Sequence, residues 1–100
     1  MKKYPDKLFT AARVTTATDL GHFVRTYRKA KGITLETVAG LSNVSTKFLS
    51  EFERGKETAE IGKILNVLNA IGLDLNIGPR GIKKLPSFDK VKKSLQETEK

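Results

Sequence analysis

The sequence contains no cysteine, which excludes disulfide bonds and cysteine-based zinc or redox sites. It also has no apolar run near the roughly 20 residues that span a bilayer, and no apolar signal-peptide core at its start. His22 is the single histidine, and with no second histidine and no cysteine in the sequence it is not expected to bind a metal ion. We therefore expect no metal, no cofactor, no membrane partner and a cytoplasmic location.

Catalytic arrangements are absent as well. No nucleophile stands at a readable spacing from a base, and no glycine-rich phosphate loop follows a strand. We therefore expect a protein that is not an enzyme.

Positive charge is in excess, and most of it lies at the two ends of the chain. The net charge is +8, of which residues 79–100 contribute +4 and residues 1–17 contribute +3. The middle, residues 18–78, carries eight basic and seven acidic side chains and is nearly balanced. A basic excess suits nucleic acid or an anionic membrane surface, and it also serves solubility, so charge alone does not choose a partner.

The composition divides the 100 residues into three parts. Residues 1–17 are predicted to be an N-terminal arm, because Pro5 discourages an early helix. Residues 18–78 are predicted to be the folded domain. Residues 79–100 are lysine-rich with sparse apolar residues, so a flexible basic tail is favoured over a marginal helix from Phe88 that Ser87 would cap.

The spacing of apolar residues predicts four helices within the domain. Each is preceded by a residue whose side chain can cap a helix, and glycine follows the first and the last. The predicted helices are 19–31, 35–41, 46–53 and 59–71, with caps at Thr18 or Asp19, Thr34, Ser45 and Thr58.

A short strand is predicted after the fourth helix, where Leu73, Leu75 and Ile77 alternate with polar residues between two glycines. A lone strand needs a partner for its backbone donors and acceptors. Pairing with a second copy across a two-fold axis supplies that partner, and these three residues are then the predicted dimerisation residues. The N-terminal arm around Leu8 and Phe9 is the competing partner.

The link between the second and third helices is the most informative segment. A bend of a few residues between two crossing helices requires one residue in the left-handed conformation, and Asn43 tolerates it better than most residues. Ala39 is small enough for the helices to approach closely, and Leu49 and Phe52 point inward. Two short helices joined in this way can lay the second helix in the major groove of DNA.

The run ITLETVAGLSNVSTKFLSEFERGK, residues 33–56, resembles the helix-turn-helix of phage repressors, the XRE or Cro/C1 type. The continuation TAEIGKILNVLNAIGLDLNI, residues 58–77, resembles HipB-like antitoxins. The resemblance implies an all-α, lambda-repressor-like domain of four to five helices with a terminal strand that pairs across a dimer. It also implies a repressor that regulates its own operon and binds a HipA-like serine/threonine kinase toxin. A stand-alone repressor without a toxin is the alternative.

Given this motif, the exposed face of the third helix is expected to read DNA bases. Lys47 suits guanine acceptors best, while Glu51 either accepts from a cytosine amine or repels phosphate. The alternative for all of these residues is a solvated face, with Ser45 only a helix cap. The predicted base-contacting residues are Ser45, Thr46, Lys47, Ser50 and Glu51.

Phosphate contacts are expected from the start of the second helix and the end of the third. The predicted residues are Thr34, Leu35, Arg54 and Lys56. Leu35 stands where many members of the family have glutamine, so it can offer only its backbone amide. Two such surfaces about 34 Å apart in a homodimer imply a palindromic double-stranded operator.

The resemblance also implies a partly buried ion pair between Arg28 and Glu53 that joins the first helix to the third. Phe48 is expected to pack in the core rather than touch a thymine methyl group. Ser42 replaces a usually apolar residue, which is expected to loosen the turn. In a bacterial cell the protein would associate with the nucleoid when bound to its operator.

Overall fold

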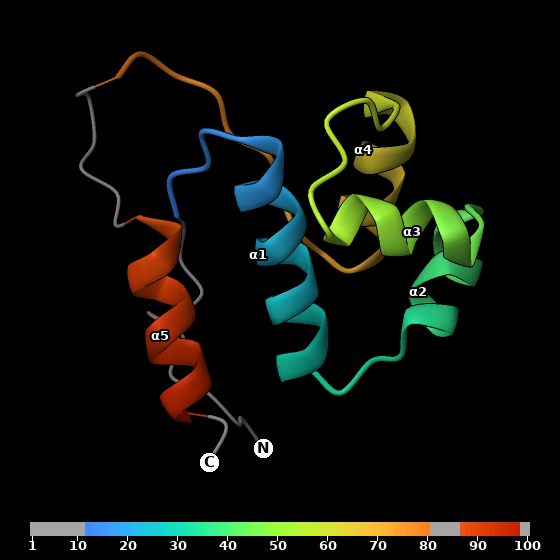
Figure 1. The fold of residues 1–100 in the computed structure, drawn as a ribbon, viewed down its shortest axis with the longest axis horizontal. Helices are drawn as coiled ribbons and strands as arrows, with labels where there is room; N and C mark the ends of the chain where they lie inside the picture. Colours follow the sequence, from blue (N-terminus) through green and yellow to red (C-terminus); the bar gives the residue numbers. More distant parts are fainter. Residues whose placement is uncertain (1–11, 81–86, 99–100) are drawn as a thin grey trace.

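Five helices make up the regular structure of the residues that the computed structural model describes, 12–80 and 87–98. They are α1 (Ala17–Ala30), α2 (Leu35–Ser42), α3 (Thr46–Glu53), α4 (Ile61–Ala70) and α5 (Phe88–Thr98). Figure 1 shows α1 in the middle, with α5 on one side and α2, α3 and α4 on the other. The all-α prediction is confirmed. None of the helices in these ranges has both the length and the apolar character needed to cross a bilayer.

The first helix begins two residues earlier than predicted. Its N-cap is Thr16, whose Oγ accepts a hydrogen bond of 3.0 Å from the backbone N–H of Asp19. The Asp19 carboxylate in turn accepts from the backbone N–H and the hydroxyl of Thr15, each at 3.2 Å. These bonds satisfy the N–H of Asp19 inside the helix and that of Thr15 just before it, so Thr16 rather than Thr18 or Asp19 caps the helix.

The helix-turn-helix has the predicted form. Thr34 and Ser45 cap α2 and α3, and Asn43 between them has φ 58° and ψ 42°. Asn43 is the one residue other than glycine with a positive φ in the described ranges. The Val44 N–H donates to the carbonyl of Ala39 at 3.0 Å, which closes the turn. The left-handed turn at Asn43 is therefore confirmed.

The interior of the domain forms between α1, α2, α3 and α4. Its largest fully buried side chains are Phe52, Leu49, Val24, Val38 and Val67. Gly21 of α1 is essential to this packing, because a Cβ there would collide with the carbonyl oxygen of Phe52. The backbones of α1 and α3 thus approach directly, and the position of α3 follows from that contact.

The fourth helix begins later than predicted, at Ile61 rather than residue 59. Its N-cap is Glu60, which makes no side-chain cap hydrogen bond, so Thr58 does not cap it. The residues before it are used in the link that carries the chain from the end of α3 to the start of α4.

Residues 73–77 form no strand within the single chain. A strand needs a second strand to pair with its backbone donors and acceptors, and the described residues of this chain provide none. The competing partner, the arm around Leu8 and Phe9, lies outside the described residues.

The C-terminal segment forms the helix from Phe88 that the sequence favoured less than a flexible tail. Ser87 Oγ accepts from the N–H of Lys90 at 3.3 Å, as a cap does. Phe88 and Val91 are buried, and the Phe88 ring lies 5.5 Å from that of Phe23 on α1. Ser87 also forms an isolated parallel bridge with Arg13. The predicted division at residue 79 therefore separates segments that contact each other.

Candidate nucleic-acid interface

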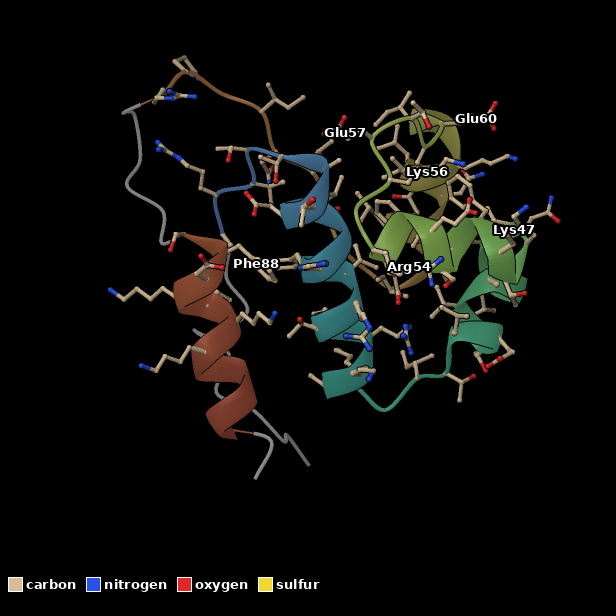
Figure 2. The ribbon with its side chains drawn as sticks, viewed as in Figure 1. Lys47, Arg54, Lys56, Glu57, Glu60 and Phe88 are labelled. Atoms are coloured by element: carbon tan, nitrogen blue, oxygen red, sulfur yellow. The ribbon has the colours of Figure 1, made fainter. Side chains whose placement is uncertain are left out.

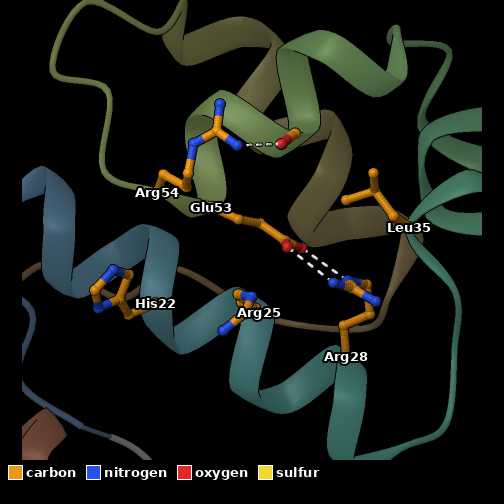
Figure 3. Close-up of a pocket in the computed structure, with 7 residues that line it drawn as sticks. His22, Arg25, Arg28, Leu35, Glu53 and Arg54 are labelled. Atoms are coloured by element: carbon orange, nitrogen blue, oxygen red, sulfur yellow. Dashed lines mark hydrogen bonds and ion pairs between the residues drawn. The ribbon is translucent and has the colours of Figure 1, made fainter.

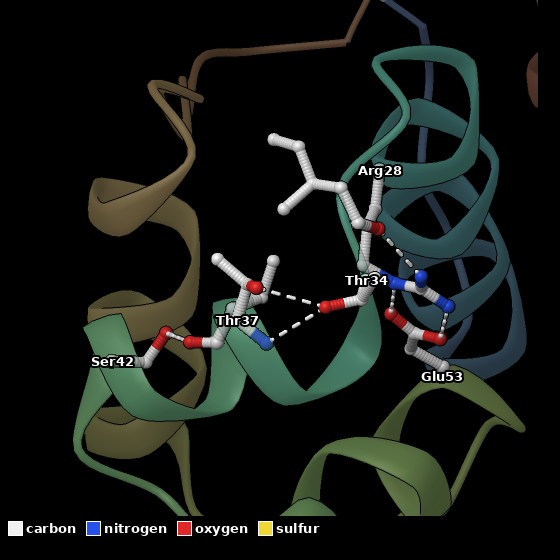
Figure 4. A network of polar contacts seen from close by, with 7 residues as sticks. Arg28, Thr34, Thr37, Ser42 and Glu53 are labelled. Carbon is white, nitrogen blue, oxygen red and sulfur yellow. Dashed lines mark hydrogen bonds and ion pairs between the residues drawn. The ribbon is translucent and has the colours of Figure 1, made fainter.

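The orientation of α3 is set by a buried ion pair at its C-terminal end. Arg28 Nε lies 2.8 Å from one carboxylate oxygen of Glu53, and Nη2 donates to the other at 2.9 Å. The side chains are 8% and 3% exposed. Arg28 also donates to the Ile33 carbonyl at 2.8 Å, which ties the α1–α2 link to the same group (Figure 4). The structure thus contains the predicted pair, and it joins three elements.

The N-terminal part of α3 presents its polar side chains to solvent. Ser45, Thr46 and Lys47 are all exposed, and Figure 2 shows Lys47 at the outer end of the helix. Ser45 Oγ accepts from the N–H of Phe48 at 2.9 Å and so caps the helix, while its own proton stays available for donation. These residues therefore offer hydroxyl and ammonium donors on one rigid surface.

The next turn of α3 is already engaged in local contacts. Ser50 Oγ accepts from Arg54 Nη1 at 2.9 Å, and Glu51 pairs with Lys56 at 3.0 Å. The hydrogen bond from Lys56 lowers the pKa of Glu51 from its ordinary value of 4.5, with smaller contributions from Lys47 and Arg54. Glu51 is consequently a carboxylate, an acceptor only, near pH 7.

The start of α2 carries the first two predicted phosphate residues. Thr34 Oγ accepts from the Thr37 N–H at 3.1 Å and donates to the Thr37 hydroxyl at 2.8 Å (Figure 4). Leu35 is half-buried and packs against the core, and since its side chain has no donor, only its backbone amide can bond to a phosphate. The N–H groups in the first turn of a helix have no partner within the helix, and they favour an anion.

Ser42 and Phe48 both face the domain interior. Ser42 is buried, and its hydroxyl donates to the Val38 carbonyl at 2.6 Å. That bond satisfies the hydroxyl without breaking α2. Phe48 stacks at 6.3 Å on Phe52, with the Lys63 ammonium 5.4 Å from its ring centroid. Phe48 thus packs against the core, as predicted.

An open cavity of about 290 Å³ between α1 and α3 was not predicted. Figure 3 shows His22 and Arg25 on α1 facing it across from Arg54. Its lining residues are His22, Arg25, Arg28, Leu35, Ser50, Glu53 and Arg54. The sequence shows only the α1 part of its lining, because His22, Arg25 and Arg28 recur every three residues along one helix and form a polar row. Within the described residues, no three His, Asp or Glu side chains group as metal ligands would.

Comparison with known proteins finds similar sequences and structures. The model of the helix-turn-helix domain family matches residues 19–76. An uncharacterized HTH-type transcriptional regulator of Sinorhizobium fredii, y4mF, is 39% identical over 67 residues, which cover 67% of this chain and 88% of that protein. The crystal structure of the clp gene regulator ClgR from C. glutamicum matches with a TM-score of 0.53 and 27% identity, over 86% of this chain and 95% of that one.

Proposed function

The chain belongs to the XRE-type helix-turn-helix family of DNA-binding transcriptional regulators and not to an enzyme family, and from that premise we propose that it is a sequence-specific repressor. The observation that carries the proposal is the geometry of α3. Its N-terminal end follows the Asn43 turn and projects polar side chains outward, while its C-terminal end is fixed by the buried pair of Arg28 and Glu53. A helix held this rigidly can present side chains to a groove in one register.

In this proposal α3 enters the major groove and its first turns read base edges. Lys47 donates to guanine O6 or N7, and Thr46, Ser45 and Ser50 bond to either base type or to a phosphate. Glu51 accepts from a cytosine amine. Lys56, which now pairs with Glu51, turns to a phosphate when that amine takes its place.

Phosphate contacts fix the register of α3 in the groove. The backbone amides of Thr34 and Leu35 face one strand at the start of α2. Arg54 and Lys56, both exposed, lie beyond the other end of α3 and supply charge. Because such contacts carry no sequence information, they set affinity and leave discrimination to the base-contacting residues.

A homodimer is part of the same proposal. Large apolar side chains are exposed on α4 and after it, namely Ile61, Leu65, Leu75 and Ile77, the last at 91%. Exposed apolar surface of this kind marks interaction sites. A second copy that pairs with residues 73–77 covers Leu75 and Ile77 and supplies the ladder partner that a strand needs, while Leu73 already packs against the core. Two α3 helices about 34 Å apart then require a palindromic operator.

The test is selection of a preferred duplex from a random pool, followed by affinity measurements on that duplex and on an unrelated one. Lys47→Ala is expected to lose about 1–3 kcal/mol of discrimination between the two duplexes. Lys90→Ala, which removes the same charge from an exposed position on α5, serves as the control. Equal weakening of both duplexes by Lys47→Ala would overturn base reading by this residue.

The resemblance of residues 58–77 to HipB-like antitoxins supports a narrower role. In that role the repressor regulates its own operon in the bacterial cytoplasm and binds a HipA-like serine/threonine kinase toxin. A stand-alone phage-type or chromosomal repressor is the alternative. Expression from the native operon with a tag on this chain distinguishes them, because an antitoxin co-purifies with a kinase-sized partner and a stand-alone repressor is recovered as itself.

A further inference from the structure

The cavity between α1 and α3 has an excess of positive charge. Glu53 is its single acidic lining residue and is neutralised by Arg28. Arg25 and Arg54 remain as cations. Arg25 forms no ion pair or hydrogen bond with another described residue, and Arg54 uses one nitrogen, Nη1, on Ser50. The cavity therefore combines two guanidinium groups that have spare donors with the imidazole of His22.

The place of this cavity relative to the base-reading residues is set by helix geometry. Lys47 and Ser50 on α3 and Arg54 at its C-cap are spaced three and four residues apart, so they follow one face of the helix to its C-terminal end. At 1.5 Å per residue, Arg54 lies about 10 Å along the helix from Lys47. The major groove is about 12 Å wide. When Lys47 reaches a base edge, the Arg54 end of α3 consequently meets the phosphates at the border of the groove.

We infer that this cavity takes a backbone phosphate of the bound DNA, held by Arg25 and His22 of α1 together with Arg54, the C-cap residue of α3. The inference rests on the proposed placement of α3 in the groove and adds a contact from α1. A guanidinium presents its donors in a planar fork that matches two phosphate oxygens, and His22 has at least one ring N–H to donate. Arg28 stays on Glu53 and shapes the floor of the site without contacting the phosphate.

The salt dependence of DNA affinity tests this assignment. Log K, where K is the association constant for DNA, falls as log salt concentration rises, and each phosphate contact that is lost reduces the magnitude of this slope by about 0.9. Arg25→Gln is expected to show that reduction, equally on the selected duplex and on an unrelated one. Arg25→Lys keeps the charge and should retain the slope. Lys90→Gln removes one charge from exposed α5, which lies across α1 from α3, and is the matched control (Figure 1).

A reduction in slope no larger for Arg25→Gln than for Lys90→Gln would overturn the inference. Titration with inorganic phosphate, followed by the NMR signals of the His22 ring and Arg25 Nε, distinguishes the source of the anion. Shifts of these signals with free phosphate, combined with an unchanged slope on DNA for Arg25→Gln, would assign the cavity to a small anion and reject the DNA contact.

Failure of the repressor proposal gives a different result. In that case the wild-type protein binds both duplexes equally, but the slope comparison on the unrelated duplex still decides whether Arg25 meets a phosphate. His22→Gln provides a second variant at the same site, with a loss of affinity that is uniform across sequences.

Discussion

The two sides of α1 hold their neighbours in different ways. On one side α3 is fixed by a backbone contact at Gly21 and by the buried pair of Arg28 and Glu53. On the other side α5 is fixed mainly by Phe88 and Val91, with lysines around them. Hydrogen-bond geometry and the close backbone approach restrict the crossing angle of α1 and α3 on the first side, whereas the second side depends on apolar burial, which is not directional. The helix that we propose to read DNA is therefore the more rigidly oriented one.

Glu53→Ala should have the largest effect on stability, because it removes the buried ion pair between α1 and α3. It leaves the Arg28 guanidinium buried without its partner, at a cost of about 3–5 kcal/mol in the free energy of unfolding. Chemical denaturation measures this loss. Glu57→Ala, at an exposed acidic position just beyond α3, should change stability by less than about 0.5 kcal/mol. Similar losses for the two variants would mean that the pair does not orient α3.

Phe88→Ala tests the opposite side and is expected to have a smaller effect. Removal of the ring forfeits its contact with Phe23, about 2 kcal/mol of apolar burial. Hydrogen exchange should then show α5 unprotected while α2, α3 and α4 keep their protection, since local units open separately. Loss of protection throughout the domain would show that both sides of α1 belong to one cooperative unit.

The smallest effect concerns the outer ion pair of α3, in contrast to the buried one. Lys56→Gln should raise the pKa of Glu51 toward 4.5, because its hydrogen bond is the main cause of the lowered value. A lowered pKa in the folded state adds stability above about pH 4.5, and that contribution is lost as pH falls through the folded pKa. NMR titration of the Glu51 carboxyl measures the shift. An unchanged pKa would contradict the stated cause.

The sequence predicted the helix-turn-helix well because its signals are local. Asn43, Thr34 and Ser45 each act on backbone groups within a few residues, and their types reveal the turn and the caps directly. The partner of Arg28, 25 residues away, came from the family resemblance, because no local pattern specifies such a pair.

The α5 side of α1 was less predictable because its stability comes from contacts distant in sequence. A helix with few apolar residues is marginal alone, and the contact of Phe88 with Phe23 that supports α5 is invisible to periodicity. The cavity escaped notice for a similar reason, since its lining comes from three helices. The strand at residues 73–77 was expected from alternation, but these residues form no strand in the single chain, because alternation alone does not supply the ladder partner that a strand needs.

Gly21 has one more consequence. Since the main chain of α1 contacts that of α3 there, the two helices form one rigid unit, and a change in the tilt of α3 would also move α1. An effector that switches DNA binding by the proposed dimer on or off must then leave the α1–α3 unit of each copy intact. It would act by changing the distance or the rotation between the two α1–α3 units of the dimer, without changing the structure of either unit.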